Sequence, residues 1–252
     1  MLVIDLILFG PIGLSIWAVQ MVWIPITAAG IINGIGHYWG YRNFACEDAS
    51  TNVFPWGILI GGEELHNNHH AYGTSAKLSS RWYEIDIGWF YIRTLETLGL
   101  AKVKKMAPKV KFNSGKAVCD FDTLQAIITH RYDVMTKYTR SMKSMCADEI
   151  GRLKNNVPAL NDSSTLKAVK HWLHLDASEL EAQDKAKLSE VLEKSKTLAT
   201  IYAMRQELAG LWARSSSSKE QLVQQLQDWC QRAEASGIDS LQQFSRKLRC
   251  YA

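Results

Sequence analysis

A long uncharged segment near the N-terminus constrains the fold more than any other feature of this sequence. Between Leu6 and Tyr41 there is no Asp, Glu, Lys or Arg, and Asp5 is the only charged side chain before Arg42. A helix needs about 20 apolar residues to cross the hydrocarbon core of a bilayer. The segment is therefore long enough to predict one membrane span with residues to spare.

Proline and glycine residues indicate how this apolar segment is divided. Pro11 and Gly13 follow a first apolar stretch, Leu2–Gly10, and we expect the full span over about Ile12–Gly36, with Pro25 as a tolerated kink. A signal peptide is the alternative, but its basic n-region and small-residue cleavage site are not present. A buried helix of a soluble protein would be shorter and flanked by charge.

Three closely spaced histidines are the strongest indication of chemistry. His66, His69 and His70 stand at positions i, i+3 and i+4 in the run Glu-Leu-His-Asn-Asn-His-His. On a helix these positions share one face, because successive residues turn by about 100°. Clustered imidazoles are the commonest means of holding a transition metal. The pattern predicts metal ligation, and a polar helical turn without a ligand is the alternative.

A polar pair lies at the end of the predicted span. Asn33 and His37 are four residues apart and would stack on one helix face where the segment leaves the membrane. Taken alone, the pair is better explained as an interfacial hydrogen-bonded pair without chemistry. Because a second histidine-bearing element follows after a short loop, we expect His37 to join the other imidazoles in one site just outside the membrane. Asn33 would hold a metal-bound water there.

These motifs resemble those of the membrane-bound fatty acyl desaturases, close to the bacterial acyl-CoA Δ9 type. The resemblance covers roughly residues 1–105. It rests on Asn33-Gly-Ile-Gly-His37-Tyr-Trp-Gly-Tyr-Arg42, Asn52, Gly62–Tyr72 with its His-x-x-His-His box, Ser75-Ala76 and Glu84–Trp89. It implies a helical membrane core capped by a cytosolic domain that carries a di-iron site.

The resemblance also implies roles for individual residues. His66, His69 and His70 correspond to the third histidine box, which binds iron. His37 corresponds to the isolated histidine ligand after the last span, and Asn33 to the asparagine that holds iron through water. A ligating imidazole needs its second nitrogen oriented by a neighbour. We expect residues nearby in sequence, namely Glu64, Asn67 and Asp86, to orient the imidazoles in this way. Glu63 and Asn68 are further candidates close in sequence.

The chemistry of desaturation sets the expected cofactor and partners. Removing two hydrogens from an unactivated methylene needs an oxidant that no side chain provides. The resemblance implies two irons, O2, an acyl-CoA or acyl-lipid substrate, and electrons from a carrier such as ferredoxin or cytochrome b5 with its reductase. A related di-iron lipid hydroxylase is an alternative. Zinc hydrolysis is a rival metal chemistry, but its usual His-Glu-x-x-His helix is absent.

The sequence departs from the desaturase pattern in its histidine content. The family carries two earlier histidine boxes, whereas the other histidines of this chain are His130, His171 and His174, all downstream. The chain therefore resembles the C-terminal part of a desaturase, and we expect the first two boxes and the first pair of spanning helices to be missing. Open coordination positions would fill with water, so we predict little or no activity for this polypeptide alone.

Charge divides the chain into two parts. Residues 1–100 hold four Lys/Arg against eight Asp/Glu, a net charge of −4, so residues 101–252 carry +8 within a total of +4. Six lysines occur between Lys102 and Lys116 without an acidic residue among them. Such a run beside a span is attracted to anionic lipid and marks the cytoplasmic side. We expect a bacterial inner-membrane protein with a cytoplasmic metal site and C-terminal region, and no nucleic-acid partner.

The remainder of the sequence predicts soluble helices. Apolar residues recur with the helical period, and three capping-box patterns indicate helix starts at Asp176 with Glu179, Ser218 with Gln221, and Asp239 with Gln242. We predict an all-α protein with three parts. Residues 1–105 are an incomplete membrane-embedded desaturase core, residues 106–118 a basic linker, and residues 119–252 a soluble helical extension. Five cysteines without a Cys-x-x-Cys motif predict reduced thiols.

The end of the chain has a second, weaker resemblance. Thr200–Ala252 is similar to the C-terminal helical segment of certain insertion-element transposases, through Tyr202-Ala-Met-Arg205, Trp229, Ala235-Ser-Gly237-Ile, Leu248 and Tyr251. That segment lies downstream of the catalytic acids of those enzymes, so the resemblance implies no chemistry. It adds a third functional alternative, a non-catalytic, membrane-anchored helical interaction protein.

Overall fold

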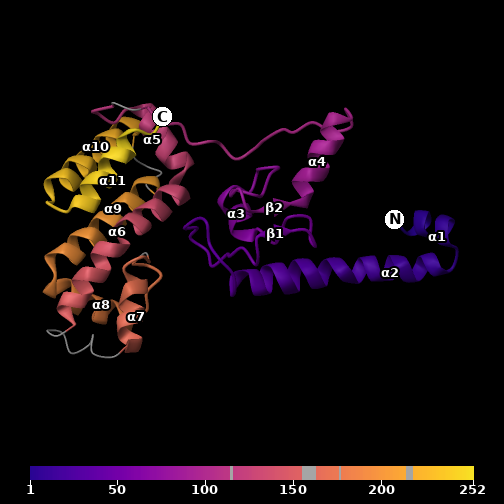
Figure 1. The fold of residues 1–252 in the computed structure, drawn as a ribbon, viewed down its shortest axis with the longest axis horizontal. Coiled ribbons are helices and arrows are strands. Elements are labelled where there is room, and N and C mark those ends of the chain that lie inside the picture. Colours follow the sequence, from indigo (N-terminus) through magenta and orange to yellow (C-terminus); the bar gives the residue numbers. More distant parts are fainter. Residues whose placement is uncertain (114–115, 155–162, 176, 214–217) are drawn as a thin grey trace. The chain divides into compact units, whose positions relative to one another are not determined.

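The computed structural model describes residues 1–113, 116–154, 163–175, 177–213 and 218–252. It divides into two compact units, Met1–Pro108 (unit 1) and Lys109–Ala252 (unit 2). Both units are built from helices, which confirms the predicted all-α class. Within the described ranges the strands are limited to β1 (Trp56–Gly57) and β2 (Ile85–Asp86), which pair in parallel (Figure 1).

Unit 1 begins with a helical hairpin. Helix α1 (Leu2–Phe9) ends at Gly10, whose φ of +58° suits glycine, and the chain reverses into α2 (Ile12–Ile24). The two helices cross closely at Gly13, where a Cβ atom would lie 2.2 Å from the backbone oxygen of Asp5. Only glycine permits this approach.

The chain continues from α2 as one long helical run. The π-helical η1 (Pro25–Gly34) starts at a proline, which has no N–H to donate into the α-helical ladder, and the 3-10 turn η2 (Ile35–His37) follows. The run Ile12–His37 is 26 residues long, and by length and composition it meets the requirement for crossing a membrane. Only 12% of its most apolar window is buried, so most of its apolar side chains lie on the surface.

The rest of unit 1 is mostly loop. The short helix α3 (His66–Ala71) and the β1–β2 pair lie beside the far end of the long helical run, and α4 (Ile87–Thr97) follows β2 directly (Figure 1). The Asp86 side chain caps α4 by accepting the Trp89 N–H. This arrangement places the histidine box next to the end of the apolar helix.

Unit 2 is a bundle of packed helices. Its elements are α5 (Phe121–Thr129), α6 (Arg131–Leu153), α7 (Ser163–Trp172), α8 (Ala182–Lys194), α9 (Lys196–Ala213), α10 (Lys219–Ala235) and α11 (Asp239–Arg249). At its centre the rings of Tyr138, Trp229 and Phe244 lie 5.1–6.4 Å apart, centroid to centroid. The two polar rings remain hydrogen-bonded, since the Tyr138 hydroxyl donates to the Ile201 carbonyl and the Trp229 indole to that of Met204.

The helical periodicity of the sequence is confirmed in this core. Most of the apolar positions predicted to face inward are buried, namely Leu188, Val191, Ile201, Met204, Leu208, Leu211, Leu222, Leu226, Trp229, Leu241, Phe244 and Leu248. The helical packing follows from that pattern, because a stripe with a 3.6-residue period can be buried only on a helix.

The predicted capping boxes have different outcomes. Ser218 and Gln221 form a complete capping box at the start of α10. The prediction for Asp239 is wrong, because Ile238 occupies the cap position of α11 and Asp239 is already in its first turn. Gln242 donates instead to the carbonyl oxygen of Glu234. Asp176, the predicted cap of the third box, lies outside the described residues.

The first residues of unit 2 pair with the end of the chain. Phe112 and Tyr251 form an antiparallel bridge, and the Asn113 N–H donates to the Cys250 carbonyl. The N–H of Ala252 donates to the carbonyl oxygen of Lys111. Residues 111–113, which fall within the segment predicted as a linker, thus belong to the packed bundle.

Candidate metal centre

Three imidazoles converge where the apolar helix meets α3. One ring nitrogen from each of His37, His66 and His70 lies within 4.8 Å of the others. The Nε2 atoms of His37 and His66 are 2.9 Å apart, and the ring centroids of His66 and His70 are separated by 4.3 Å. The site joins the last residue of η2 to two residues of α3.

His69 and Asn33 lie apart from this trio. The His69 ring is more than 6 Å from the rings of both His66 and His70, centroid to centroid, and its Nδ1 is 3.3 Å from a carboxylate oxygen of Glu63. Asn33 is exposed within η1. Of the five residues predicted to hold metal, the structure brings three together.

Thr51 ties the end of the long helical run to the loop before α3. Its N–H and its hydroxyl both donate to the Gly36 carbonyl, at 2.6 and 2.9 Å. Gly36 packs against His66, where a Cβ would lie at an ordinary contact distance of 3.5 Å from Cδ2 of that ring. The hydrogen bonds from Thr51 to Gly36 therefore hold the next residue, His37, beside α3.

A second glycine allows the loop to close. Gly40 has a φ of +147°, and a Cβ there would lie 2.2 Å from the Asn52 carbonyl oxygen. This close approach lets Tyr41 and Asn52 form their antiparallel bridge. The bridge brings the two arms of the loop together next to His37.

The face of α3 opposite the imidazoles is buried by asparagines. Oδ1 of the Asn67 side chain accepts the backbone N–H groups of Asn43 and Phe44 at 2.9 and 2.8 Å. Its amide donates to the carbonyl oxygens of Phe44 and Ser50. Asn67 thus fastens the loop 43–50 onto α3, which is how this loop comes to lie beside the metal centre.

Asn68 joins α3 to a buried carboxylate. The NH2 group of its side chain donates to Glu84 at 2.9 Å, and the oxygen of the same side chain, Oδ1, accepts from the side chains of Asn43 and Asn52. Glu84 also accepts the Tyr41 hydroxyl at 2.8 Å. Burial, followed by this hydrogen bond to a carboxylate, raises the pKa of Tyr41 far above its usual value, so the phenol stays protonated.

The predicted supporting residues bind the backbone. Within the described residues, the hydrogen bonds of Glu64, Asn67 and Asp86 serve mainly to hold turns and loops. The Glu64 carboxylate, which is only 1% exposed, accepts three N–H groups. Its donors are Leu59, Ile60 and Gly62, and those of Asp86 are Leu78, Ser79 and Trp89.

The carboxylates that contact imidazoles are Asp48 and Glu63. Oδ2 of Asp48 lies 2.5 Å from Nδ1 of His70, and its Oδ1 accepts the Ser50 N–H. Glu63 was among the residues nearby in sequence, but the analysis of motifs missed Asp48. The two residues of the pair are 22 positions apart. The only local signal is the Asp-x-Ser turn, which is common in loops without any site.

The electrostatics of the site favour neutral imidazole at its centre. Burial, together with the neighbouring imidazoles, lowers the pKa of His66 to about 4. For Asp48, burial acts to raise the pKa, but hydrogen bonds from Ser50 and His70 outweigh it and lower the pKa to about 2. The close contact between Glu63 and His69 lowers the pKa of the acid and raises that of the imidazole.

The donor set fits a first-row transition metal. Nδ1 of His66 is buried without a hydrogen-bond partner, and it is Nε2 of the same ring that faces His37. Two imidazole nitrogens bound to one ion at about 2.1 Å each, with their bonds at right angles, lie roughly 3 Å apart. The observed 2.9 Å between the Nε2 atoms of His37 and His66 matches that requirement.

Comparison with known families gives one extended match. A family model described as transposase, of the ISL3 type, matches residues 117–252, which is more than half of the chain. The chain belongs to this transposase family. The part that the transposase model matches lies within unit 2 and contains none of the three converging histidines.

Comparison with curated proteins shows that this transposase-family chain is also similar to desaturases. The sn-2 palmitoyl-lipid 9-desaturase of Nostoc sp. (strain 36) is 44% identical over 77 residues, covering 31% of this chain and 27% of the relative. The sn-1 stearoyl-lipid 9-desaturase of Anabaena variabilis is 36% identical over 106 residues, 41% of this chain and 39% of the relative. The acyl-CoA 5-desaturase AL21 of Anemone leveillei is 37% identical over 107 residues, 42% of this chain and 33% of the relative.

The matches are partial. The chain spans between 27 and 39% of the length of these three curated relatives. No solved structure matches the chain.

Proposed function

We propose that unit 1 is part of a membrane-bound acyl desaturase and that its converging imidazoles bind iron. The observation that carries this proposal is the close approach of His37, His66 and His70 in a segment with desaturase motifs. The partial identity to 9-desaturases and a 5-desaturase supports it. The 2.9 Å approach of the Nε2 atoms of His37 and His66 supports it independently of any relative.

The remaining ligands follow the desaturase pattern in this proposal. His69 binds the second iron of a complete centre, and Asn33 holds iron through water. Iron in this site would supply the oxidising power that removal of hydrogen from an unactivated methylene requires. The protein's contribution is to keep His66 neutral, to orient the imidazoles, and to hold His66 and His70 on α3. Asp48 orients His70, and Asn67 and Asn68 fix the helix itself.

The proposed setting is a bacterial inner membrane. The apolar helix Ile12–His37 is the proposed span, and the lysine run from Lys102 supports a cytoplasmic position for the metal centre and unit 2. The substrate in this proposal is an acyl-CoA or acyl-lipid, with O2 as co-substrate and electrons from ferredoxin or cytochrome b5 with its reductase.

We further propose that the 252 residues alone have little or no desaturase activity. A di-iron centre needs more imidazoles than the four in unit 1. With too few ligands, water fills the open positions and the affinity for iron falls.

Complementation tests the proposed activity. The N-terminal part of the Anabaena relative is fused in frame before Ile12, and the fusion is expressed in a bacterium supplied with saturated acyl chains. We expect a new oxygen-dependent unsaturated product in gas chromatography of the lipids. The matched control carries His66→Ala and His70→Ala and should give none.

The product separates the proposal from its alternatives. An iron-loaded fusion that forms no altered acyl chain would refute the desaturase proposal, and a hydroxylated product would establish the lipid hydroxylase instead. The transposase-family match and the separate core of unit 2 favour a second candidate, a helical interaction module. Deleting residues 114–252 from the active fusion without consequence for the host would count against that second function.

A further inference from the structure

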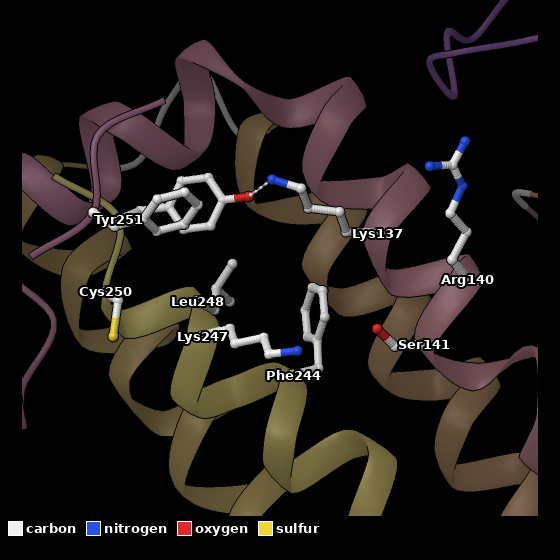
Figure 2. A pocket seen from close by; sticks show the side chains of 9 residues that line it. Lys137, Arg140, Ser141, Phe244, Lys247, Leu248, Cys250 and Tyr251 are labelled. Carbon is white, nitrogen blue, oxygen red and sulfur yellow. Dashed lines mark hydrogen bonds between the residues drawn. The ribbon is translucent and has the colours of Figure 1, made fainter. Parts of the chain in front are cut away.

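Unit 2 contains a cavity that the proposed function does not use. Its volume is about 490 Å3, within the range of small-molecule sites. It opens between α6, α11 and the last residues of the chain (Figure 2). Its lining consists of Phe112, Lys137, Arg140, Ser141, Phe244, Lys247, Leu248, Cys250 and Tyr251.

Helices α6 and α11 each line this cavity with residues from one helix face. On each helix the lining residues stand at positions i, i+3 and i+4, which share one face. They are Lys137, Arg140 and Ser141 on α6, and Phe244, Lys247 and Leu248 on α11. The cavity is therefore a product of two rigid helices.

The inner wall of the cavity is apolar and aromatic. Phe244, Leu248 and Tyr251 are buried, whereas Phe112 is 56% exposed at the entrance. The rings of Phe112 and Tyr251 meet edge to face with centroids 5.1 Å apart. Such a wall favours a ligand with an apolar body, because burying that body removes apolar area from water and aromatic edges pack well against another ring.

The rim is cationic, and the lining contains no carboxylate. Lys137 is already engaged, since its Nζ donates to the Tyr251 hydroxyl at 2.9 Å and lies 2.7 Å from Asp133 (Figure 2). Arg140 and Lys247 are exposed, and neither forms an ion pair with any residue that the structure describes. Two uncompensated cations beside an apolar wall attract a negative group.

We propose that this cavity binds a small organic anion, in which a phosphate or carboxylate group is joined to an aromatic or aliphatic body. Lys247, whose ammonium lies beside Phe244 (Figure 2), binds the anionic group, Arg140 adds positive charge at the rim, and Phe112, Phe244 and Tyr251 pack against the body. A nucleic-acid strand fits less well, because strand binding uses a long basic groove with successive stacking rings. The lining instead forms one short compartment between α6 and α11.

Calorimetric titration of the full chain tests this site. The protein is placed in nanodiscs of zwitterionic lipid and titrated with 1-naphthyl phosphate, a soluble aromatic anion. We expect saturable binding at one site per chain, with inorganic phosphate binding at least about tenfold more weakly because it lacks the apolar body. Phe112→Ala should reduce this preference, and its half-exposed position makes the change compatible with folding.

Charge variants locate the anionic group. Arg140→Gln and Lys247→Gln should each weaken binding by about fivefold, the loss expected for one exposed charge. Arg246→Gln is the matched control, because Arg246 is an exposed neighbour on α11 outside the cavity lining. Thermal unfolding of each variant checks that the bundle is intact.

Several results would overturn the proposal. These are the absence of saturable binding, equal affinity for inorganic phosphate, and equal weakening by Arg246→Gln, which would indicate general attraction of anions. Displacement of the probe by a single-stranded oligonucleotide that also depends on Arg246 would assign the surface to nucleic acid. Nanodiscs with anionic lipid identify the source of the ligand: competition for the cavity supports a lipid headgroup, and unchanged probe binding supports a soluble anion.

Discussion

His70 and Asp48 form the closest imidazole–carboxylate contact of the metal centre, with Nδ1 and Oδ2 2.5 Å apart. The contact leaves Nε2 of His70 as the nitrogen available for a metal. It also links the loop 43–50 to α3 at the metal centre itself. A carboxylate in this position sets the ring orientation and increases the basicity of the ligand.

Removing the Asp48 charge should therefore weaken metal binding. We expect Asp48→Asn to lower the affinity for Fe2+ by about tenfold or more, because the single amide oxygen cannot accept both hydrogen bonds of the carboxylate and does not increase the basicity of the ring. If that oxygen keeps the Ser50 N–H and with it the turn, the His70 ring loses its acceptor. Anaerobic Fe2+ titration of the protein in nanodiscs measures the effect. Glu47→Gln removes a neighbouring exposed charge as the control, and equal losses in both variants would contradict the assigned role.

His66 and His69 should differ in their importance for a single bound ion. His66→Ala removes a member of the converging trio and should reduce Co2+ affinity by about 100-fold or more, because only two imidazoles remain. His69→Ala should reduce it by less than about tenfold, since His69 stands outside the trio. The visible absorption of bound Co2+ measures the affinity of both variants. A larger loss for His69→Ala would show that another set of imidazoles binds the ion.

Trp229 should dominate the stability of unit 2. Trp229→Ala leaves a cavity at the centre of the bundle and should lower the free energy of unfolding by about 3–5 kcal/mol. Trp229→Phe keeps the aromatic packing but leaves the Met204 carbonyl without its indole donor, at a cost of about 1–3 kcal/mol. Thermal unfolding followed by circular dichroism gives the order of the variants. Trp82→Phe, at a side chain that is 95% exposed, should leave the transition unchanged.

Acid should destabilise unit 2 through His174. Burial, together with the positive charges of Arg205, His171 and Lys143, lowers the pKa of His174 to about 4. Between the unfolded value near 6.5 and this folded value, the unfolded chain binds the proton more readily. The stabilising contribution is therefore complete above pH 6.5 and is lost as the pH falls toward 4.

His174→Gln should reduce this acid sensitivity. At pH 5 the variant should lose about 1 kcal/mol less stability than the wild type, relative to pH 7.5, after allowance for the partial exposure of the ring. Denaturant unfolding at the two pH values measures the difference. Parallel pH dependence of the two proteins would show that His174 does not carry this effect.

Local sequence patterns predicted much of the helical structure. The i, i+3, i+4 spacing placed His66 and His70 on one face of α3, and the apolar run predicted the helix that ends at His37. Ser218 and Gln221 predicted the start of α10 because both partners of a capping box lie within one helical turn. The prediction at Asp239 was wrong by one residue, because the chain turns at Gly237 and Ile238 takes the cap position.

Contacts between distant residues were beyond the sequence patterns. Glu64 and Asp86 were expected near imidazoles because they are close in sequence, yet their carboxylates bind backbone N–H groups. Asp48 reaches His70 only because Asn67 fastens an intervening loop onto the opposite face of α3. No short-range sequence pattern predicts that this loop packs against α3.

The sequence by itself determined which segments are helical, which helix is apolar enough for a membrane, and which side chains offer metal-binding nitrogens, because each depends on residue type and short-range spacing. The tertiary structure decided which imidazoles meet, which carboxylates orient them, and that α6 and α11 enclose a cationic cavity. The physical reason is that these features depend on where loops return and how helices pack. Both are set by hydrogen bonds and burial between residues far apart in the chain.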